Sequence, residues 1–371
     1  MNLAFLYQLK SIASIALGLF GIGIIIGLHE FGHYLFARLF GVRAPSFSIG
    51  MGPKLISKKM WGTDFKISAI PLGGYVEIAG MAEIGQGEQK EAKALDKGSF
   101  QVKPYWQKAL ILMGGILFNF ILAFIIFIGL YFTGMPKSLY LNPDDIQPII
   151  KTTIVDKPAA IAQLQKGDVI RAINNEPTPN ILNVLTLLPK YKNATISIIV
   201  DRNGQEFTKT ITPDQNGKIG IEFKAAGYLT PQSFAQSIKN AWNLTIDLTK
   251  KTFQVFARLF RKRTTEGLGG PLMLVAQVMA NAKEGLSVFL FLLAFISINL
   301  AFINLIPLPI TDGGQLVFTT IEAIIRRPLP EKAVEAIHTI SWMLVLALFA
   351  FLTFKDSKML FWEKIKHLLG K

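Results

Sequence analysis

The sequence predicts a polytopic α-helical membrane protein with four transmembrane helices, a membrane-associated β-hairpin or sheet region and one inserted β-rich domain. Three observations lead to this fold class. Four apolar runs are long enough to cross a bilayer. A glycine-punctuated stretch of short alternating runs follows the first of them, which is typical of strands and tight turns. Residues 136–224 contain no run that could span, and several of their segments alternate as strands do.

Composition sets the class of partner. The chain has 371 residues, a net charge of +14 and 51% hydrophobic residues. Its basic residues flank the apolar runs, which favours the lipid bilayer, and anionic lipid in particular, over nucleic acid. The chain has no cysteine, so it forms no disulfide and offers no thiolate to a metal. The first apolar run shows no small-residue cleavage site, which predicts a retained helix and not a signal peptide.

The first run extends from Ile12 to about Phe40 and contains His29-Glu30-Phe31-Gly32-His33. Histidines four positions apart share one face of a helix and can bind one metal ion, with the glutamate as general base toward water. His29 would lie roughly 25 Å along the axis from Ile12, inside a bilayer core of about 30 Å. Polar groups at that depth are costly, which indicates a functional site. The alternative is a histidine pair hydrogen-bonded within a helix bundle.

A catalytic zinc usually has three protein ligands and a fourth position for water. The pentapeptide supplies two of them. The sequence therefore predicts a third ligand elsewhere in the chain, a carboxylate or another histidine.

Residues 44–80 follow the first helix and contain Gly50, Gly52, Gly73 and Gly74 between short alternating runs. Irregular backbone next to a membrane helix persists only where it is buried in protein or lines a wet cavity. Two interpretations stay open. The strands form an edge that pairs with an extended peptide near the metal, or they are a small sheet that caps the helices.

The second run, Ala109 to Phe132, follows an interfacial Tyr105-Trp106 pair. Gly114-Gly115 would let another helix approach closely, and Asn119 could hydrogen-bond across to it. We interpret these residues as packing groups.

Residues 136–224 then form one β-rich domain with a short helix after Lys157 and a hairpin turn at Asn203-Gly204. Within 225–284, residues 233–262 repeat apolar side chains every four positions between basic ones. This pattern predicts an interfacial amphipathic helix, although a helix packed on the β-rich domain is the alternative.

The third run, Leu286 to Ile306, ends at Pro307 and Pro309 because proline cannot continue a helix. Asp312 then begins another helix. By itself Asp312 would be interpreted as an N-cap, but the bundle lacks a third ligand, so we predict that this carboxylate faces His29. Asn304 is either an interhelical hydrogen-bonding group or a contact for substrate backbone.

The fourth run extends from Ile337 to Phe354. Residues 1–135 thus hold two spans and the strands, and residues 285–371 hold two spans and a basic tail.

These motifs resemble the site-2 protease family of intramembrane zinc metalloproteases, and within it the bacterial branch of regulator of sigma E proteases. The matching stretches cover the chain in the right order. They are His29 to His33, Phe47 to Pro53, Pro71 to Val76, and Asn304 to Gly314, with Lys157 to Pro177 similar to a PDZ domain of the bacterial protease type.

The resemblance implies that His29, His33 and Asp312 bind Zn²⁺ and that Glu30 is the catalytic base. Substrate contacts would come from Asn304 and its neighbours and from the glycine-bearing strands, that is, from Asn304, Pro307, Pro309, Gly50, Gly52, Gly73 and Gly74. The substrate would be the transmembrane helix of a single-pass protein, such as an anti-sigma factor after a first cleavage. The PDZ-like domain would bind a peptide C-terminus.

The sequence departs from the family at three points. Thr311 stands where an apolar residue is usual, Gly114-Gly115 replaces a frequent Gly-Pro, and Gln163 replaces a glycine common in such PDZ domains.

The family places the protein in the bacterial inner membrane, with the active site near the cytoplasm and the PDZ-like domain outside. Basic residues after the first helix agree with this orientation, whereas the lysines of residues 355–371 do not. A catalytically silent PDZ-bearing adaptor is the alternative function, and the presence of Glu30 argues against it. A zinc transporter would need polar groups in more of the spans.

Overall fold

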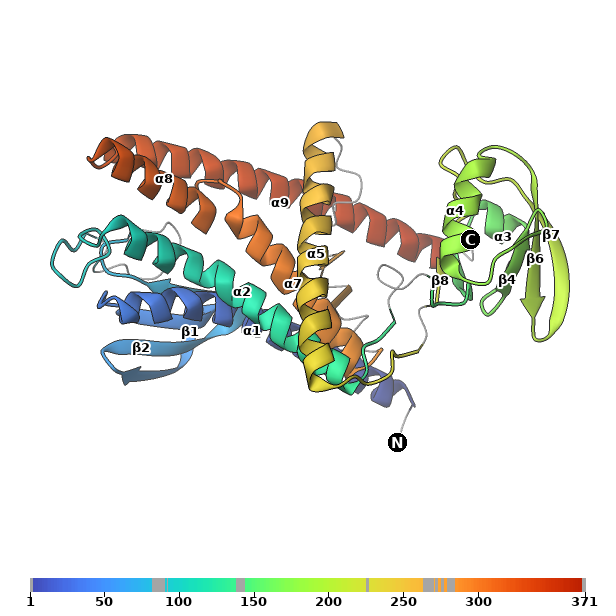
Figure 1. Cartoon of the computed structure of the whole chain (residues 1–371), viewed down its shortest axis with the longest axis horizontal. Helices are drawn as coiled ribbons and strands as arrows, with labels where there is room; N and C mark the ends of the chain where they lie inside the picture. The colour runs from blue at the N-terminus through green and yellow to red at the C-terminus, as the bar shows by residue number, and fades with distance from the viewer. Residues whose placement is uncertain are drawn as a thin grey trace. The chain divides into compact units, whose positions relative to one another are not determined.

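The computed structural model describes residues 3–81, 91, 93–137, 144–224, 227–262, 270, 273–274, 277–278 and 284–368. Within these residues, four helices are long and apolar enough to cross a membrane (Figure 1). The candidate spans are Ala16–Leu39, Tyr105–Thr133, Leu286–Leu305 and Lys332–Lys358. This confirms the four predicted spans. The chain divides into two compact units, of which Thr133–Pro231 form most of the second.

The first unit contains the helices α1 (Leu3–Leu39), α5 (Phe234–Lys262), α7 (Leu286–Leu305) and α8 (Asp312–Ile325), together with α2 (Tyr105–Thr133) and α9 (Glu331–Leu368) except for their C-terminal ends. Pro104 directly precedes α2, where a missing backbone N–H costs no helical hydrogen bond. Helix α9, which contains the fourth predicted span, extends beyond that span at both ends. Its flanks are polar, so hydropathy located only the membrane-spanning core of a longer helix.

The strands β1 (Ser46–Met60) and β2 (Thr63–Glu77) form a sheet beside α1 (Figure 1). Residues 46–49 pair with residues 64–67 and also with residues 74–77, so this part of β1 lies between two segments of β2. Positive φ angles at Gly50 and Gly73 allow the chain to kink between the paired segments. Among the described residues no third strand joins this sheet, which leaves residues 74–77 as an edge.

An aromatic cluster holds the sheet against α1. The ring of Tyr34 lies 5.8 Å from that of Phe47 and 5.4 Å from that of Phe65. Phe47 and Val76 are buried in the same core, together with Ile111 of α2. Contacts of this kind fix the register of the sheet relative to the helix, since a slip by one residue would turn these side chains outward.

Helix α5 is amphipathic, as predicted. Ala241, Leu244 and Leu248 are buried, whereas Phe234 and Trp242 are exposed. The helix packs on α7, where Thr252 Oγ1 donates to Asn299 Oδ1 at 3.3 Å and the Phe256 ring lies 5.1 Å from that of Phe302. Within the first unit, α5 therefore covers one side of the helix that leads to Asn304.

The second unit contains a two-stranded sheet, β3 (Ile150–Thr153) with β8 (Ile221–Phe223), and a four-stranded sheet in the order β5-β4-β6-β7. The members of the larger sheet are β4 (Val169–Ile173), β5 (Glu176–Pro177), β6 (Ile196–Arg202) and β7 (Gln205–Ile211). Short helices α3 (Pro158–Ile161), α4 (Ile181–Leu187) and η1 (Leu188–Tyr191) complete it. Asn203 and Gly204 form the β6–β7 turn with positive φ, as their sequence predicted. The PDZ-like assignment stays a prediction.

One buried carboxylate fixes the interior of this unit. Asp168 is 0% exposed and accepts hydrogen bonds from Arg202 Nε at 2.7 Å and from the backbone N–H of Gln165 at 2.8 Å. Arg202 also donates to the carbonyl of Gln163, the residue that replaces the expected glycine and has a φ of 60°. Burial opposes ionisation of Asp168, yet these donors hold the pKa of its carboxyl below the usual range.

We therefore expect Asp168→Asn to destabilise the second unit by about 1–3 kcal/mol at pH 7, because Arg202 loses its charged partner. A lowered folded-state pKa contributes stability above the unfolded-state pKa, and this contribution is lost as the pH falls through the folded-state value. The difference between wild type and variant should consequently shrink below about pH 4. Hydrogen exchange of β6 amides in the full-length protein measures this difference in the stability of the second unit.

Asp201→Asn is the matched control. Asp201 forms an ion pair with Arg171, whose side chain is half exposed, so its loss should cost less than about 1 kcal/mol. Equal effects of the two substitutions, or a difference that grows in acid, would contradict the role given to Asp168.

Candidate metal centre

The two histidines of α1 face the interior of the helix bundle. His29 is 7% exposed and His33 is 6% exposed. Four residues separate them, so they lie one above the other on the same helix face. Their Nε2 atoms are 3.3 Å apart and their rings are nearly perpendicular, at 85°. The helix thus presents two imidazole nitrogens to a single point.

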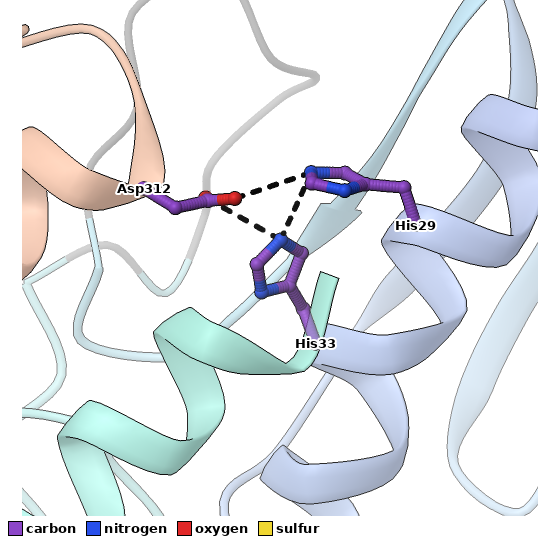
Figure 2. A group of neighbouring side chains, drawn as sticks. All are labelled: His29, His33 and Asp312. Carbon is purple, nitrogen blue, oxygen red and sulfur yellow. Dashed lines mark hydrogen bonds and ion pairs between the residues drawn. The ribbon is translucent and has the colours of Figure 1, made fainter. Parts of the chain in front are cut away.

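Asp312 completes the group from the start of α8 (Figure 2). Its Oδ2 lies 3.3 Å from His29 Nε2, and its Oδ1 lies 3.4 Å from His33 Nε2. The N-cap of α8 is Thr311, whose hydroxyl oxygen accepts from Gly314 N and whose hydroxyl donates to the carbonyl of Ile306. The interpretation of Asp312 as an N-cap is therefore wrong, because the preceding residue caps the helix and leaves the carboxylate free to face the histidines.

The three side chains suit a metal ion. A tetrahedral zinc site with bonds of about 2.0 Å separates its ligand atoms by roughly 3.3 Å. The 3.3 Å between the two Nε2 atoms matches this spacing, and each Nε2 has one of the two carboxylate oxygens of Asp312 at 3.3 or 3.4 Å. With one ligand atom taken from each residue, the three atoms lie within 4.8 Å of one another. Asp312 Oδ2 is buried and accepts no hydrogen bond from the described residues. A cation at the centre would satisfy this oxygen and the imidazole lone pairs together.

Partners on α2 contact the outer nitrogens of both rings. His33 Nδ1 lies 2.8 Å from the carbonyl oxygen of Ile111, which can only accept, so Nδ1 carries a proton and, in the neutral ring, Nε2 has a free lone pair. His29 Nδ1 lies 3.1 Å from the amide nitrogen of Asn119. The sequence predicted that Asn119 could hydrogen-bond across to another helix, which this contact confirms, but it did not identify His29 as the partner. The sequence signal for this partner was that Asn119 lies one helical turn after Gly115, so it shares the helix face at which another helix was predicted to approach.

Glycines allow α1 and α2 to approach at the centre. Gly32 and Gly114 face each other, and a side-chain carbon at either would clash with the backbone of the other. A side-chain carbon at Gly115 would collide with His33 Nε2 and with the ring of His29. The predicted close approach is therefore confirmed, and Gly115 provides the space that the imidazoles occupy.

Glu30 lies beside the histidines on α1, half buried. Its Oε2 accepts the backbone N–H of Val76, an edge residue of the sheet, at 3.1 Å. A side-chain carbon at Gly74 would be 3.5 Å from Glu30 Cγ. The sheet edge and the glutamate are thus in contact.

The other residues predicted to bind substrate fall into two groups. Asn304 lies in the site, with its amide nitrogen 3.2 Å from His29 Nε2, and Gly74 adjoins Glu30. The remaining residues shape the backbone nearby. Gly50 and Gly52 kink β1, Gly73 packs on Met51, and Pro307 and Pro309 form the turn between α7 and α8.

Comparison with known proteins gives consistent results. The family model for peptidase family M50 matches residues 17–348. Among relatives bearing the name "Putative zinc metalloprotease", a Mesorhizobium japonicum protein is 31% identical over 91% of this chain and 96% of its own length. One from Rickettsia conorii is 34% identical over 82% of this chain and 87% of its own length. One from Campylobacter jejuni is 28% identical over 94% of both chains.

Replacement of Gly115 by alanine tests the geometry. Its methyl group must displace His33 or His29, so we expect zinc affinity to fall by ~10–100-fold, as when the surroundings of a metal ligand are disrupted. Elemental analysis of the purified protein after dialysis against a zinc buffer measures the loss.

The matched control is Gly129→Ala in the same helix, where a side-chain carbon meets no atom within 4 Å. It should retain zinc. A Gly115→Ala protein with wild-type zinc content would contradict the arrangement of α1 and α2 described above.

Proposed function

We propose that this chain, which belongs to peptidase family M50, the site-2 protease family, hydrolyses a peptide bond within the transmembrane helix of a single-pass membrane protein. It is a zinc metalloendopeptidase with several membrane-spanning helices. The observation that carries this proposal is that His29, Glu30 and His33 lie on a helix that could cross a membrane and that Asp312 of α8 meets the two histidines there. Polar and ionisable side chains within a membrane-spanning helix are costly, and their presence there favours a reaction carried out inside the bilayer.

We assign His29, His33 and Asp312 as the protein ligands. When bound, zinc supplies a Lewis acid that polarises the scissile carbonyl and acidifies a water molecule. Three protein ligands leave a fourth position, which is the pattern of catalytic and not structural zinc sites.

Glu30 is the general base in this proposal. It follows His29 directly, and its carboxylate is held at the sheet edge by the N–H of Val76. It would take a proton from the attacking water and deliver it to the leaving amine. The hydrogen bond to Val76 fixes the direction of one carboxylate oxygen, so the other oxygen can point toward the water.

Substrate would bind in an extended form. A helical peptide bond is shielded by its own side chains and hydrogen bonds, so the scissile segment must unwind before attack. The sheet edge at residues 74–77 offers backbone groups to such a segment, and the missing side chain of Gly74 lets it approach Glu30. The amide of Asn304 can donate to a substrate carbonyl on the other side. Gly50, Gly52, Gly73, Pro307 and Pro309 would maintain the backbone shape that this binding needs.

The β-rich unit would control which substrates reach the zinc site. As a PDZ-like domain it would bind the C-terminus of a substrate that another protease has trimmed, as in regulated proteolysis of an anti-sigma factor. The protein would lie in the bacterial inner membrane with its zinc site near the cytoplasm and this unit outside. Basic residues that follow α1 support this orientation. Exposed aromatic side chains on α5, with basic neighbours, would contact the lipid interface.

Substitution of Glu30 by glutamine tests catalysis apart from metal binding. With a tagged single-pass helix that contains helix-breaking residues, we expect cleavage to fall by ~10²–10⁴-fold, because the amide cannot accept the proton. Zinc content should remain at about one per chain, as a single three-ligand site predicts. Asp247→Asn, an exposed change on α5, is the control and should cleave normally.

The adaptor alternative makes a different prediction for the same assay. Wild-type protein that holds zinc but cleaves no member of a panel of such helices would support it. Wild-type protein that holds no zinc would overturn the ligand assignment.

Orientation is tested with single cysteines in this cysteine-free chain. Gln205→Cys, exposed at the start of β7 beside the β6–β7 turn, should react with a membrane-impermeant maleimide in intact cells. Gln101→Cys, exposed between β2 and α2, should react only after lysis. The reverse pattern would place the β-rich unit in the cytoplasm.

A further inference from the structure

Asn119 of α2 contacts the metal centre from behind. It is 0% exposed, and its amide nitrogen lies 3.1 Å from His29 Nδ1. Its Oδ1 is buried without a hydrogen-bond partner among the described residues. Ser297 of α7 donates to its backbone carbonyl at 2.9 Å, which holds this turn of α2 in place. A buried amide with one unsatisfied end, placed against a ligand, calls for an explanation beyond packing.

The protonation of an imidazole limits what Asn119 can do. A neutral ring has one N–H donor and one acceptor nitrogen. His29 can bind a metal through Nε2 only if that atom has a free lone pair, so the proton must lie on Nδ1. The group opposite Nδ1 must then be an acceptor. A carboxamide rotated by 180° exchanges oxygen and nitrogen with almost no change in shape, so the two orientations of Asn119 correspond to the two tautomers of His29.

We propose that Asn119 is a positioning residue for His29: in the zinc-loaded protein its Oδ1 accepts the Nδ1–H of His29 and thereby directs the Nε2 lone pair toward Asp312 and His33. This inference rests on the proposed role of His29 as a ligand. His33 obtains the same support from the Ile111 carbonyl, which can only accept, so its tautomer is fixed by backbone. The tautomer of His29 depends on a side chain and can therefore be changed by substitution.

The protonation of His29 also explains what its contact with Asn304 implies. Its amide nitrogen lies 3.2 Å from His29 Nε2 and competes with a metal for that lone pair. Both cannot use the lone pair at once. Zinc binding would therefore release the Asn304 amide, which becomes available to a substrate carbonyl.

Two substitutions of similar volume separate hydrogen bonding from packing. Asn119→Leu removes the acceptor, and we expect zinc affinity, measured by competition with a chelator, to fall by ~10–100-fold. Asn119→Asp keeps an oxygen that can only accept, and its affinity should stay within about threefold of wild type, as expected when the partner of a ligating histidine is kept. The visible spectrum of the Co²⁺-substituted Asn119→Asp protein should match that of wild type, whereas the Asn119→Leu spectrum should change.

Thr252→Val is the matched control, because it also removes one interhelical hydrogen bond of the first unit but lies away from the histidines. It should bind zinc as wild type does. Wild-type affinity in Asn119→Leu would overturn the proposal, as would equal losses in Asn119→Leu and Asn119→Asp.

A second measurement needs no change at Asn119. The chain has four histidines, so ¹⁵N-histidine labelling of a His338→Gln, His367→Gln protein leaves only His29 and His33 visible. In the zinc-loaded state we expect both rings to be protonated on Nδ1. A ring protonated on Nε2 would overturn the proposal. Absence of zinc from the wild-type protein would instead overturn the ligand assignment, so the two failures are distinguishable.

Discussion

The rest of the structure depends on holding the three side chains proposed as zinc ligands, His29, His33 and Asp312, so that their lone pairs face one another among apolar helices. Imidazole and carboxylate lone pairs that face one another at 3.3–3.4 Å away from bulk water are costly unless a proton or a cation lies between them. The protein offsets this cost by fixing each ligand from behind. Helix α1 sets the spacing of the histidines, and α2 supplies polar partners to their outer nitrogens. Without that support the rings could turn and the point of convergence would be lost.

Small residues make the arrangement possible. The contact of Gly32 with Gly114 brings two helix backbones together, and Gly115 leaves room for the imidazoles. At the other side of the site, Gly313 and Gly314 pack directly against the carbonyls of the turn between α7 and α8. Thr311 replaces the usual apolar residue but gains a function here, because it caps α8 and bonds the turn. The departure therefore stabilises the position of Asp312.

Helix α5 connects the two parts of the chain in sequence. The chain leaves the β-rich unit and enters α5, which contacts α7 at Asn299 and Phe302, a short distance before Asn304. A displacement of α5 would therefore act first on the helix that carries Asn304 into the site. A displacement of the sheet edge would likewise act on Glu30, because the backbone N–H of Val76 donates a hydrogen bond to its carboxylate. The groups proposed for catalysis and for substrate binding are thus held by the sheet edge and by the helix that α5 contacts.

The sequence by itself determined the four spans and the β-rich region and predicted the types of the proposed ligands, because hydropathy, strand alternation and histidine spacing act over a few neighbouring residues. It also predicted Asp312 as the third ligand, from the need for a third protein ligand and from a family resemblance. Only the tertiary structure decided that Thr311 takes over the capping and that Asn119 contacts His29 instead of merely packing. It likewise showed that residues 46–49 pair on both sides. The contact of Asn119 with His29 joins residues 90 positions apart, and the double pairing of residues 46–49 depends on how β2 folds back, so a local pattern carries no information about either. The cap at Thr311 is local, but its choice over Asp312 depends on where the carboxylate is held.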